Sequence, residues 1–207
     1  IFGTCIPEIP HTGDVPLVAD MSSDILSRAY KVDKFGLIYA GAQKNIGPAG
    51  LTIVIVRKDL LGQEMEFTPL MFKYQTHVAK KSAYNTPPCF AIYMAGLVFD
   101  WTLKQGGVAV MEQKNREKAA LLYDYLDASP LFESMIKGKD RSIMNVPFST
   151  KDTELDKRFI DEADAAGLKT LKGYRTVGGM RASIYNPMPI EGVKALVDFM
   201  AEFERKA

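Results

Sequence analysis

The sequence predicts an α/β protein whose first half supplies part of a mainly parallel sheet and whose second half forms a small α+β domain. Two observations support this class. Short apolar runs fill the first half, as expected of strands in a sheet covered by helices. In the second half, amphipathic helical patterns alternate with less apolar strands. The character changes near residue 104, so we expect two domains, residues 1–104 and 105–207.

Three strands are expected in the first half, at residues 16–20, 35–39 and 51–56. The last run is rich in β-branched residues, which is typical of a strand buried on both faces. Asp20 stands at the end of the first run. Residues 63–84 are polar and broken, which favours an exposed loop.

Four helices and three further strands are expected from residue 87 onward. The helices are expected at residues 87–105, 108–126, 153–166 and 189–205, and the strands at residues 142–148, 168–171 and 180–185. Thr86 and Thr153 are suited to cap the first and third helices, and Gly106-Gly107 ends the first. The solvent-facing side of the second helix is assigned to Glu112, Lys114, Arg116, Glu117 and Lys118.

Composition excludes several classes of function. The 207 residues are 47% hydrophobic and 25% charged, which is ordinary for a globular protein in water. A net charge of +1 gives no reason to expect a nucleic acid or a membrane as partner. Cys5 and Cys89 lack neighbours at metal-binding spacing, so we expect no metal and reduced thiols in a cytoplasmic protein. The opening residues, 1–4, have no initiator Met, so we expect the chain to start within a longer protein.

Lys44 is the first candidate for chemistry, because it stands in a glycine-rich loop, residues 40–50, between two expected strands. A lysine amine is nucleophilic only in its neutral form, which burial favours. Such a lysine can condense with an aldehyde to form a Schiff base. The alternative is a solvated loop lysine, which the pattern alone favours.

Asp20, Asn85 and Thr86 are the next candidates. A carboxylate at the C-terminal end of a strand lies where open α/β sheets bind ligands, although Asp20 is also suited to cap a helix. Asn85-Thr86 precedes a helix, whose free N–H groups favour phosphate. Simple capping is the alternative for this pair.

Arg175 and Arg181 are candidates for binding an anion. Arg181 has small and apolar neighbours, so an unpaired guanidinium there would be costly. A guanidinium matches a carboxylate with two parallel hydrogen bonds. A salt bridge to an Asp or Glu side chain is the alternative for both residues.

Five segments resemble motifs of the phosphoserine aminotransferases, in the order in which that family has them. The segments are Tyr39–Gly50 around Lys44, Ala19–Ser23, Tyr84–Pro88, Arg141–Phe148 and Gly178–Asn186. Five ordered matches cover nearly the whole chain and are more specific than any one of them.

The resemblance implies a homodimeric fold-type I aminotransferase that uses pyridoxal 5'-phosphate in serine biosynthesis. It implies interconversion of O-phospho-L-serine and 2-oxoglutarate with 3-phosphohydroxypyruvate and L-glutamate. Lys44 resembles the lysine that forms the Schiff base with the cofactor. The other implied roles are Asp20 at the pyridine nitrogen, Gln43 as a cofactor contact, Asn85 and Thr86 at the cofactor phosphate of the other subunit, Arg181 at the substrate α-carboxylate and Arg175 at its distal anion.

One feature departs from the family. The family often has His-Arg where this chain has Tyr174-Arg175, so residue 174 is in doubt as an anion ligand. The resemblance also implies that a preceding N-terminal segment would carry the aromatic residue that stacks on the pyridine ring, so we expect the chain alone to be truncated and inactive. Two alternatives remain: another fold-type I enzyme, acting on a different amino acid or as a cysteine desulfurase, and a dimerising fragment without cofactor.

Overall fold

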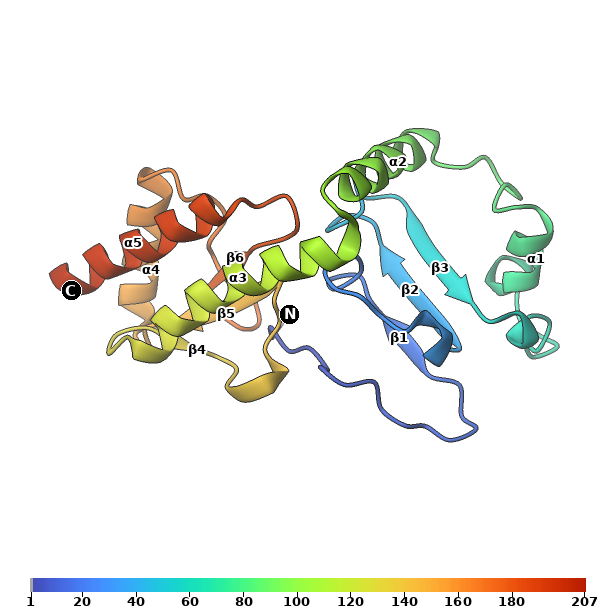
Figure 1. The fold of residues 1–207 in the computed structure, drawn as a ribbon, viewed down its shortest axis with the longest axis horizontal. Helices are drawn as coiled ribbons and strands as arrows, with labels where there is room; N and C mark the ends of the chain where they lie inside the picture. The colour runs from blue at the N-terminus through green and yellow to red at the C-terminus, as the bar shows by residue number, and fades with distance from the viewer. Residues whose placement is uncertain (1) are drawn as a thin grey trace. The chain divides into compact units, whose positions relative to one another are not determined.

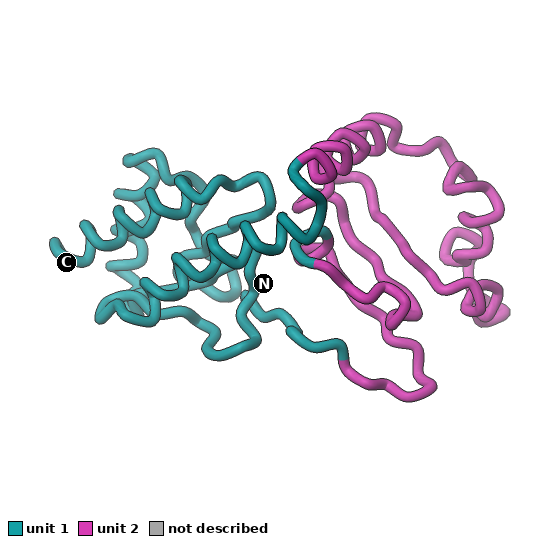
Figure 2. The backbone as a smooth tube through the Cα atoms, viewed as in Figure 1, with its two compact units in different colours: residues 1–9, 26–28, 105–207 teal, residues 10–25, 29–104 magenta. Residues whose placement is uncertain are grey.

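The computed structural model describes residues 2–207. The chain divides into two compact units, drawn in different colours in Figure 2. Unit 1 contains the chain up to Ile9, residues 26–28 and residues 105–207, and unit 2 contains residues 10–25 and 29–104.

Unit 2 contains a three-stranded sheet in the order β1-β2-β3, with β1 parallel and β3 antiparallel to β2. Its strands and α-helices, labelled in Figure 1, are β1 (Val18–Asp20), β2 (Leu37–Gly41), β3 (Thr52–Val56), α1 (Tyr74–Ala79) and α2 (Cys89–Lys104). Short 3-10 helices cover Val32–Lys34, Lys58–Leu60 and Leu70–Phe72. The strands predicted at the three apolar runs are therefore confirmed.

Burial in unit 2 corrects part of that reading. β3 is not buried on both faces, because the side chains of Val54 and Ile55 are 39% and 42% exposed. Val18 on β1 is 57% exposed. Only β2, the central strand, carries a mostly buried set of side chains. The apolar runs thus predicted the positions of the strands correctly, but the prediction that β1 and β3 are buried was wrong.

The segment after β3 also differs from the expected loop, because α1 and a 3-10 helix lie within residues 63–84. The following helix, α2, begins at Cys89 rather than at residue 87. Ile92 N donates to the carbonyl of Pro88 at 3.0 Å. Pro88 therefore precedes the first helical residue, and Thr86 is not the cap.

Unit 1 contains a second three-stranded sheet, in the order β4-β5-β6, with both pairs antiparallel. Its elements are α3 (Gly107–Ala128), β4 (Glu133–Ser134), the 3-10 helix Gly138–Asp140, β5 (Asn145–Ser149), α4 (Thr153–Ala165), β6 (Met180–Ser183) and α5 (Ile190–Lys206). α3 and α5 run side by side (Figure 1). The expected α+β character of this part of the chain is confirmed.

The core of unit 1 lies between one face of this sheet and its helices. Val146 and Phe148 of β5 and Met180 of β6 are fully buried there. Four phenylalanines complete the core from different elements, namely Phe132, Phe148, Phe159 and Phe203. Their ring centroids lie 5.1–6.1 Å apart, mostly edge to face, which is a favourable arrangement of aromatic rings.

Three local predictions for unit 1 are wrong. No strand forms at residues 168–171. The next residue, Lys172, forms a single β-bridge with Met180 instead. The cap of α4 is Asp152 rather than Thr153, because its carboxylate accepts from Glu154 N and Leu155 N. Lys118 is not on the solvent-facing side of α3, since it is 2% exposed. The described helices include none that is long and apolar enough to cross a membrane.

Candidate active site

Asp20 ends β1 beside Tyr39 of β2, because the parallel register pairs these two residues. Ser22 N donates to Asp20 Oδ1 at 2.8 Å, and Met21 N donates to the carbonyl of Tyr39 at 2.8 Å. These bonds turn the chain as soon as the strand ends. The carboxylate therefore lies at the C-terminal end of β1, as expected. The strand was expected to be buried, but Asp20 and Val18 are both exposed.

The surroundings of Asp20 keep its carboxylate ionised. Partial desolvation raises the pKa of this carboxyl group. Hydrogen bonds from Ser22 and Tyr39 and the positive charge of Lys44 lower the pKa, and together they outweigh the desolvation. The pKa of Asp20 consequently lies below its ordinary value. Asp20 and Lys44 are thus brought close enough to interact electrostatically, although 24 positions separate them in the sequence.

Lys44 lies in the loop between β2 and β3, which is anchored by buried residues on both sides of the lysine. Ala42 and Ile46 are fully buried, and Gly47 N donates to the carbonyl of Ala42 at 2.7 Å to close a single turn. Gln43 and Lys44 are exposed at the top of this turn. The expected burial of Lys44 is therefore not found, because the neighbouring β3 is itself partly exposed.

Close packing holds the loop on two sides. A Cβ added at Gly41 would lie 2.6 Å from Gln43 Oε1, so the Gln43 side chain folds back over the glycine. Gly41 N also donates to Ser22 Oγ at 3.0 Å, which ties the loop to the turn after Asp20. A Cβ at Gly47 would lie 3.5 Å from Ala95 N, so the loop backbone lies against α2. The turn that carries Lys44 is therefore held between the Asp20 turn and α2.

Asn85 and Thr86 lie just before α2 in unit 2 and are both exposed. Asn85 Nδ2 lies 3.7 Å from Met71 Sδ, a weak contact that leaves the side chain available. Two prolines separate the pair from the first turn of α2. The pair does not cap the helix, so its polar groups remain candidates for binding a ligand.

Arg181 lies on β6 of unit 1, opposite Pro147 of β5. Its backbone N donates to the carbonyl of Leu171 at 2.7 Å. Its side-chain Nε is buried and has no hydrogen-bond partner within the described residues. A buried guanidinium donor without an acceptor is costly, and a bound carboxylate would satisfy it. Among residues 2–207, Arg181 forms no salt bridge with an Asp or Glu side chain, so the structural alternative is not found.

Two polar residues beside Arg181 were missed by the sequence analysis. Asn145, which pairs with Ser183 in the register, lies with its Nδ2 3.0 Å from the phenol oxygen of Tyr185. Burial raises the pKa of Tyr185, while Asn145 and the charge of Arg181 lower it, and the first effect is larger. The alternation through β6 and the two residues after it signals this face, because Arg181, Ser183 and Tyr185 are partly exposed while their neighbours are buried.

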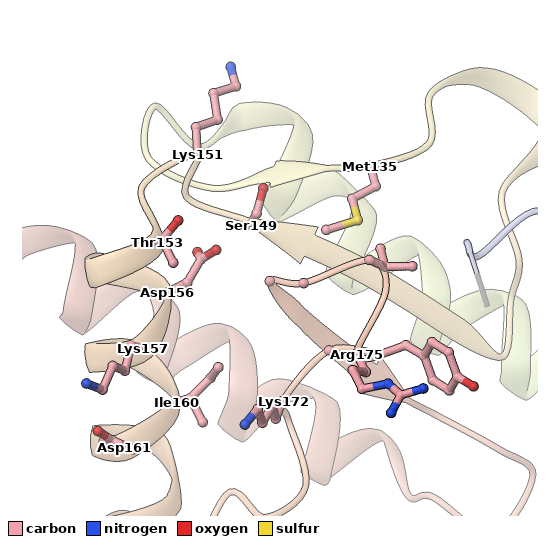
Figure 3. A pocket seen from close by; sticks show the side chains of 15 residues that line it. Met135, Ser149, Lys151, Thr153, Asp156, Lys157, Ile160, Asp161, Lys172 and Arg175 are labelled. Carbon is pink, nitrogen blue, oxygen red and sulfur yellow. The ribbon is translucent and has the colours of Figure 1, made fainter.

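Arg175 is exposed in a tight loop of unit 1 that joins Lys172 to Met180. The loop is closed by Gly173 N donating to the Gly179 carbonyl at 2.8 Å. It forms one wall of a cavity of about 960 Å³, and side chains along α4 form another (Figure 3). Tyr174 and Arg175 both line this cavity.

The sequence-predicted residues therefore divide between the units. Unit 2 contains Asp20, Gln43, Lys44, Asn85 and Thr86, and unit 1 contains Arg175 and Arg181. Among residues 2–207, no group of three or more His, Cys, Asp or Glu side chains is arranged to hold a metal ion.

Curated relatives match this chain over its whole length. A phosphoserine aminotransferase of Laribacter hongkongensis (strain HLHK9) is 60% identical over 207 residues, which are 100% of this chain and 57% of that protein. One from Bacillus cereus (strain ATCC 14579) is 56% identical over 204 residues, covering 99% of this chain and 57% of that protein. The chain thus spans a little more than half the length of these relatives.

Solved structures agree with the fold. Phosphoserine aminotransferase from Bacillus circulans subsp. alkalophilus superposes with a TM-score of 0.96 at 47% identity, covering 100% of this chain and 57% of that one. Alanine–glyoxylate aminotransferase from Nostoc sp. has a TM-score of 0.73 at 13% identity over 91% of this chain and 53% of that one, a likeness of fold alone. The expected fold-type I architecture is confirmed. Residues 3–196 match the family described as Aminotransferase class-V, and the chain therefore belongs to that family.

Proposed function

We propose that this chain is part of a pyridoxal-phosphate-dependent aminotransferase that interconverts O-phospho-L-serine and 2-oxoglutarate with 3-phosphohydroxypyruvate and L-glutamate in serine biosynthesis. The observation that carries the proposal is the 60% identity over all 207 residues to a protein named phosphoserine aminotransferase. The ionised Asp20 beside Lys44 supports it independently.

The residues of unit 2 fit the cofactor. When bound, pyridoxal phosphate supplies an electron sink for the substrate amino carbon. Asp20 is the anion for the pyridine nitrogen, since its pKa is held low. Lys44 holds the cofactor covalently and moves the proton at the substrate Cα, a general acid–base role. Gln43 contacts the cofactor beside Lys44, and Asn85 with Thr86 binds the phosphate of a partner subunit's cofactor.

The arginines of unit 1 fit an anionic substrate. Arg181 binds the substrate α-carboxylate, a role that its unpartnered, buried Nε supports. Arg175 binds the distal anion, and its exposure in the loop beside the cavity leaves the guanidinium accessible. Tyr174 also lines the cavity, and its phenol O–H can donate a hydrogen bond to an anion.

The domain arrangement and the partners are also proposals. Residues 1–104 belong to the large cofactor domain and residues 105–207 to the small domain. The complete protein is a homodimer with shared active sites, located in the cytoplasm.

The exposed apolar side chains of unit 2 support the need for a further segment. Phe90, Tyr93 and Leu103 of α2 are 70%, 64% and 71% exposed. A globular protein rarely leaves a helix so apolar in water. We propose that the segment that makes the curated relatives longer covers this surface, and that the chain alone is inactive.

A substitution of Lys44 tests the function. Borohydride reduction of the complete protein with pyridoxal phosphate is expected to add the cofactor's mass to the peptide that contains Lys44. Lys44→Ala should abolish both this addition and transamination of phosphoserine, while Lys34→Ala, at another exposed lysine of unit 2, should change neither. A mass addition that persists in Lys44→Ala contradicts the assignment.

A comparison of amino donors separates the related enzymes. Phosphoserine should be preferred over serine and alanine, because Arg175 is available for a second anion that neither of them carries. Equal or faster turnover with alanine or aspartate would instead support an aminotransferase for another amino acid.

A further inference from the structure

Two buried polar residues lie one helical turn apart on α3. Asn115 is 0% exposed and Lys118 is 2% exposed, whereas Lys114, which directly precedes Asn115, is exposed to solvent. They share a face with the apolar residues Met111 and Leu122. Burying an amide and an ammonium in such a stripe is costly unless both are hydrogen-bonded. The hydrogen-bond partners of Asn115 and Lys118 therefore indicate which segments these two side chains hold in place.

Lys118 binds the backbone at the end of the strand that carries Arg181. Its Nζ donates to the carbonyl of Ile184 at 3.0 Å and to that of Tyr185 at 2.9 Å. These carbonyls follow directly after β6, where the ladder with β5 is ending. The ammonium thus fixes a backbone segment that the sheet alone does not hold.

Asn115 binds two further segments. Its Nδ2 donates to the carbonyl of Ser27 at 2.9 Å and to Asn186 Oδ1 at 2.8 Å. Asn186 Nδ2 in turn donates to the carbonyl of Leu26 at 3.0 Å. Leu26 has a φ of +63°, an uncommon conformation for a non-glycine residue that surrounding contacts must maintain.

One of the two anchored segments adjoins the residues of the proposed site in unit 1. Tyr185, held by Lys118 through its backbone, lies against Asn145 on the polar face of β6 that Arg181 shares. Leu26 and Ser27 follow the turn that begins at Asp20, after five intervening residues, Met21–Ile25. One helix face therefore holds the ends of both segments.

We propose that Lys118 and Asn115 are positioning residues that orient Arg181 for the substrate carboxylate by anchoring Ile184–Asn186 to α3. The inference rests on the proposed function, in which Arg181 binds the substrate. Neither residue touches substrate in this role. Lys118 acts through the backbone of Tyr185, and Asn115 acts through Asn186.

Lys118→Met is the primary test, because methionine keeps the length and the apolar stem while removing both hydrogen bonds. In the complete enzyme, KM for phosphoserine and for 2-oxoglutarate should each rise about tenfold, the scale of losing a hydrogen bond to a charged group. The value of kcat should change less than about twofold, because groups at Lys44 are untouched. Lys114→Met, on the exposed side of the same helix, is the matched control and should leave both constants unchanged.

A purely structural role gives a different result. If Lys118→Met lowers the melting temperature while both KM values stay as in wild type, the proposal is overturned. Asn115→Leu provides a second variant in case Lys118→Met does not fold, since it removes the donor and leaves the ammonium in place. It should raise the same two KM values, and unchanged values would also overturn the proposal.

Amide exchange separates this inference from the proposed function. Lys118→Met should speed exchange at residues 181–186 about tenfold relative to Lys114→Met, with little change in α4. If the wild-type enzyme fails to transaminate phosphoserine, the proposed function fails, while faster exchange at these residues still supports the anchoring. Unchanged exchange there contradicts the anchoring whatever the activity.

Discussion

The two sheets of this chain differ in how their strands are covered, and the sheet with the more apolar strands is the less covered one. In unit 1, Val146, Phe148 and Met180 are fully buried beneath helices of the same unit. In unit 2, Val18, Val54 and Ile55 are between 39% and 57% exposed. Unit 1 therefore completes its own hydrophobic core, and unit 2 does not. An apolar sequence specifies a strand, but only the surrounding chain decides whether the strand is buried.

The largest expected effect is in the core of unit 1. Phe159 is fully buried and lies 5.1 Å, centroid to centroid, from both Phe132 and Phe203. Phe159→Ala should lower the free energy of unfolding of unit 1 by about 3–5 kcal/mol, through lost burial and the cavity left behind. Because α5 belongs to unit 1, amide exchange in α5 as a function of urea concentration measures the free energy of unfolding of this unit. A loss below about 1 kcal/mol would mean that the aromatic cluster collapses around the gap.

An intermediate effect is expected from pH, also in unit 1. Burial lowers the pKa of Lys118 to about 8, below its ordinary unfolded value of about 10.4. Between these two pH values the unfolded chain binds more protons than the folded chain, so stability rises with pH. Below about pH 8 both states are protonated and the contribution is constant.

Lys118→Met isolates this contribution. The difference in unfolding free energy, wild type minus Lys118→Met, should become more favourable to wild type from pH 7.5 to pH 10. Measuring both proteins at each pH cancels the titration of the other groups. A difference that stays constant, or falls, shows that Lys118 keeps its proton through this range.

The smallest effect is expected at the exposed face of unit 2. Phe90 is 70% exposed on α2, so Phe90→Ser should change the stability of this chain by less than about 0.5 kcal/mol. Trp101, the single tryptophan, lies on the same helix, and its fluorescence follows unfolding of unit 2. In the complete protein, where a further segment is proposed to cover this face, the same substitution should cost more. Equal effects in both proteins would weaken that proposal.

Much of the fold was predictable because local patterns determine it. The spacing of apolar residues identified α3, α4 and α5, and the runs around residues 16–20 and 51–56 identified two strands. The strand expected at residues 168–171 was wrong, because Leu171 pairs through its carbonyl with Arg181 without forming a ladder. The caps were also misassigned, since Asp152 competes with Thr153 at adjacent positions and both types cap helices.

The site was predictable where side-chain chemistry is local. Asp20 at a strand end and Lys44 in a glycine-rich loop follow from neighbouring residues, and their electrostatic interaction is present. Lys118 was predicted to face solvent because its side chain is charged, although its position in the helical repeat favours the buried face. Its spacing from Met111, Asn115 and Leu122 places it on the buried stripe of α3, so helical periodicity carried the correct signal. Its carbonyl partners lie 66 and 67 residues away, beyond what a local pattern predicts.

The connection between the units has a consequence for protease sensitivity. Because the chain up to Ile9 and residues 26–28 belong with residues 105–207, the polypeptide passes from one unit to the other four times. Gly3, for example, accepts at its carbonyl from Ser142 N, at 2.8 Å. A protease that nicks one connection leaves the fragments joined by the others, so a single cleavage does not release either unit.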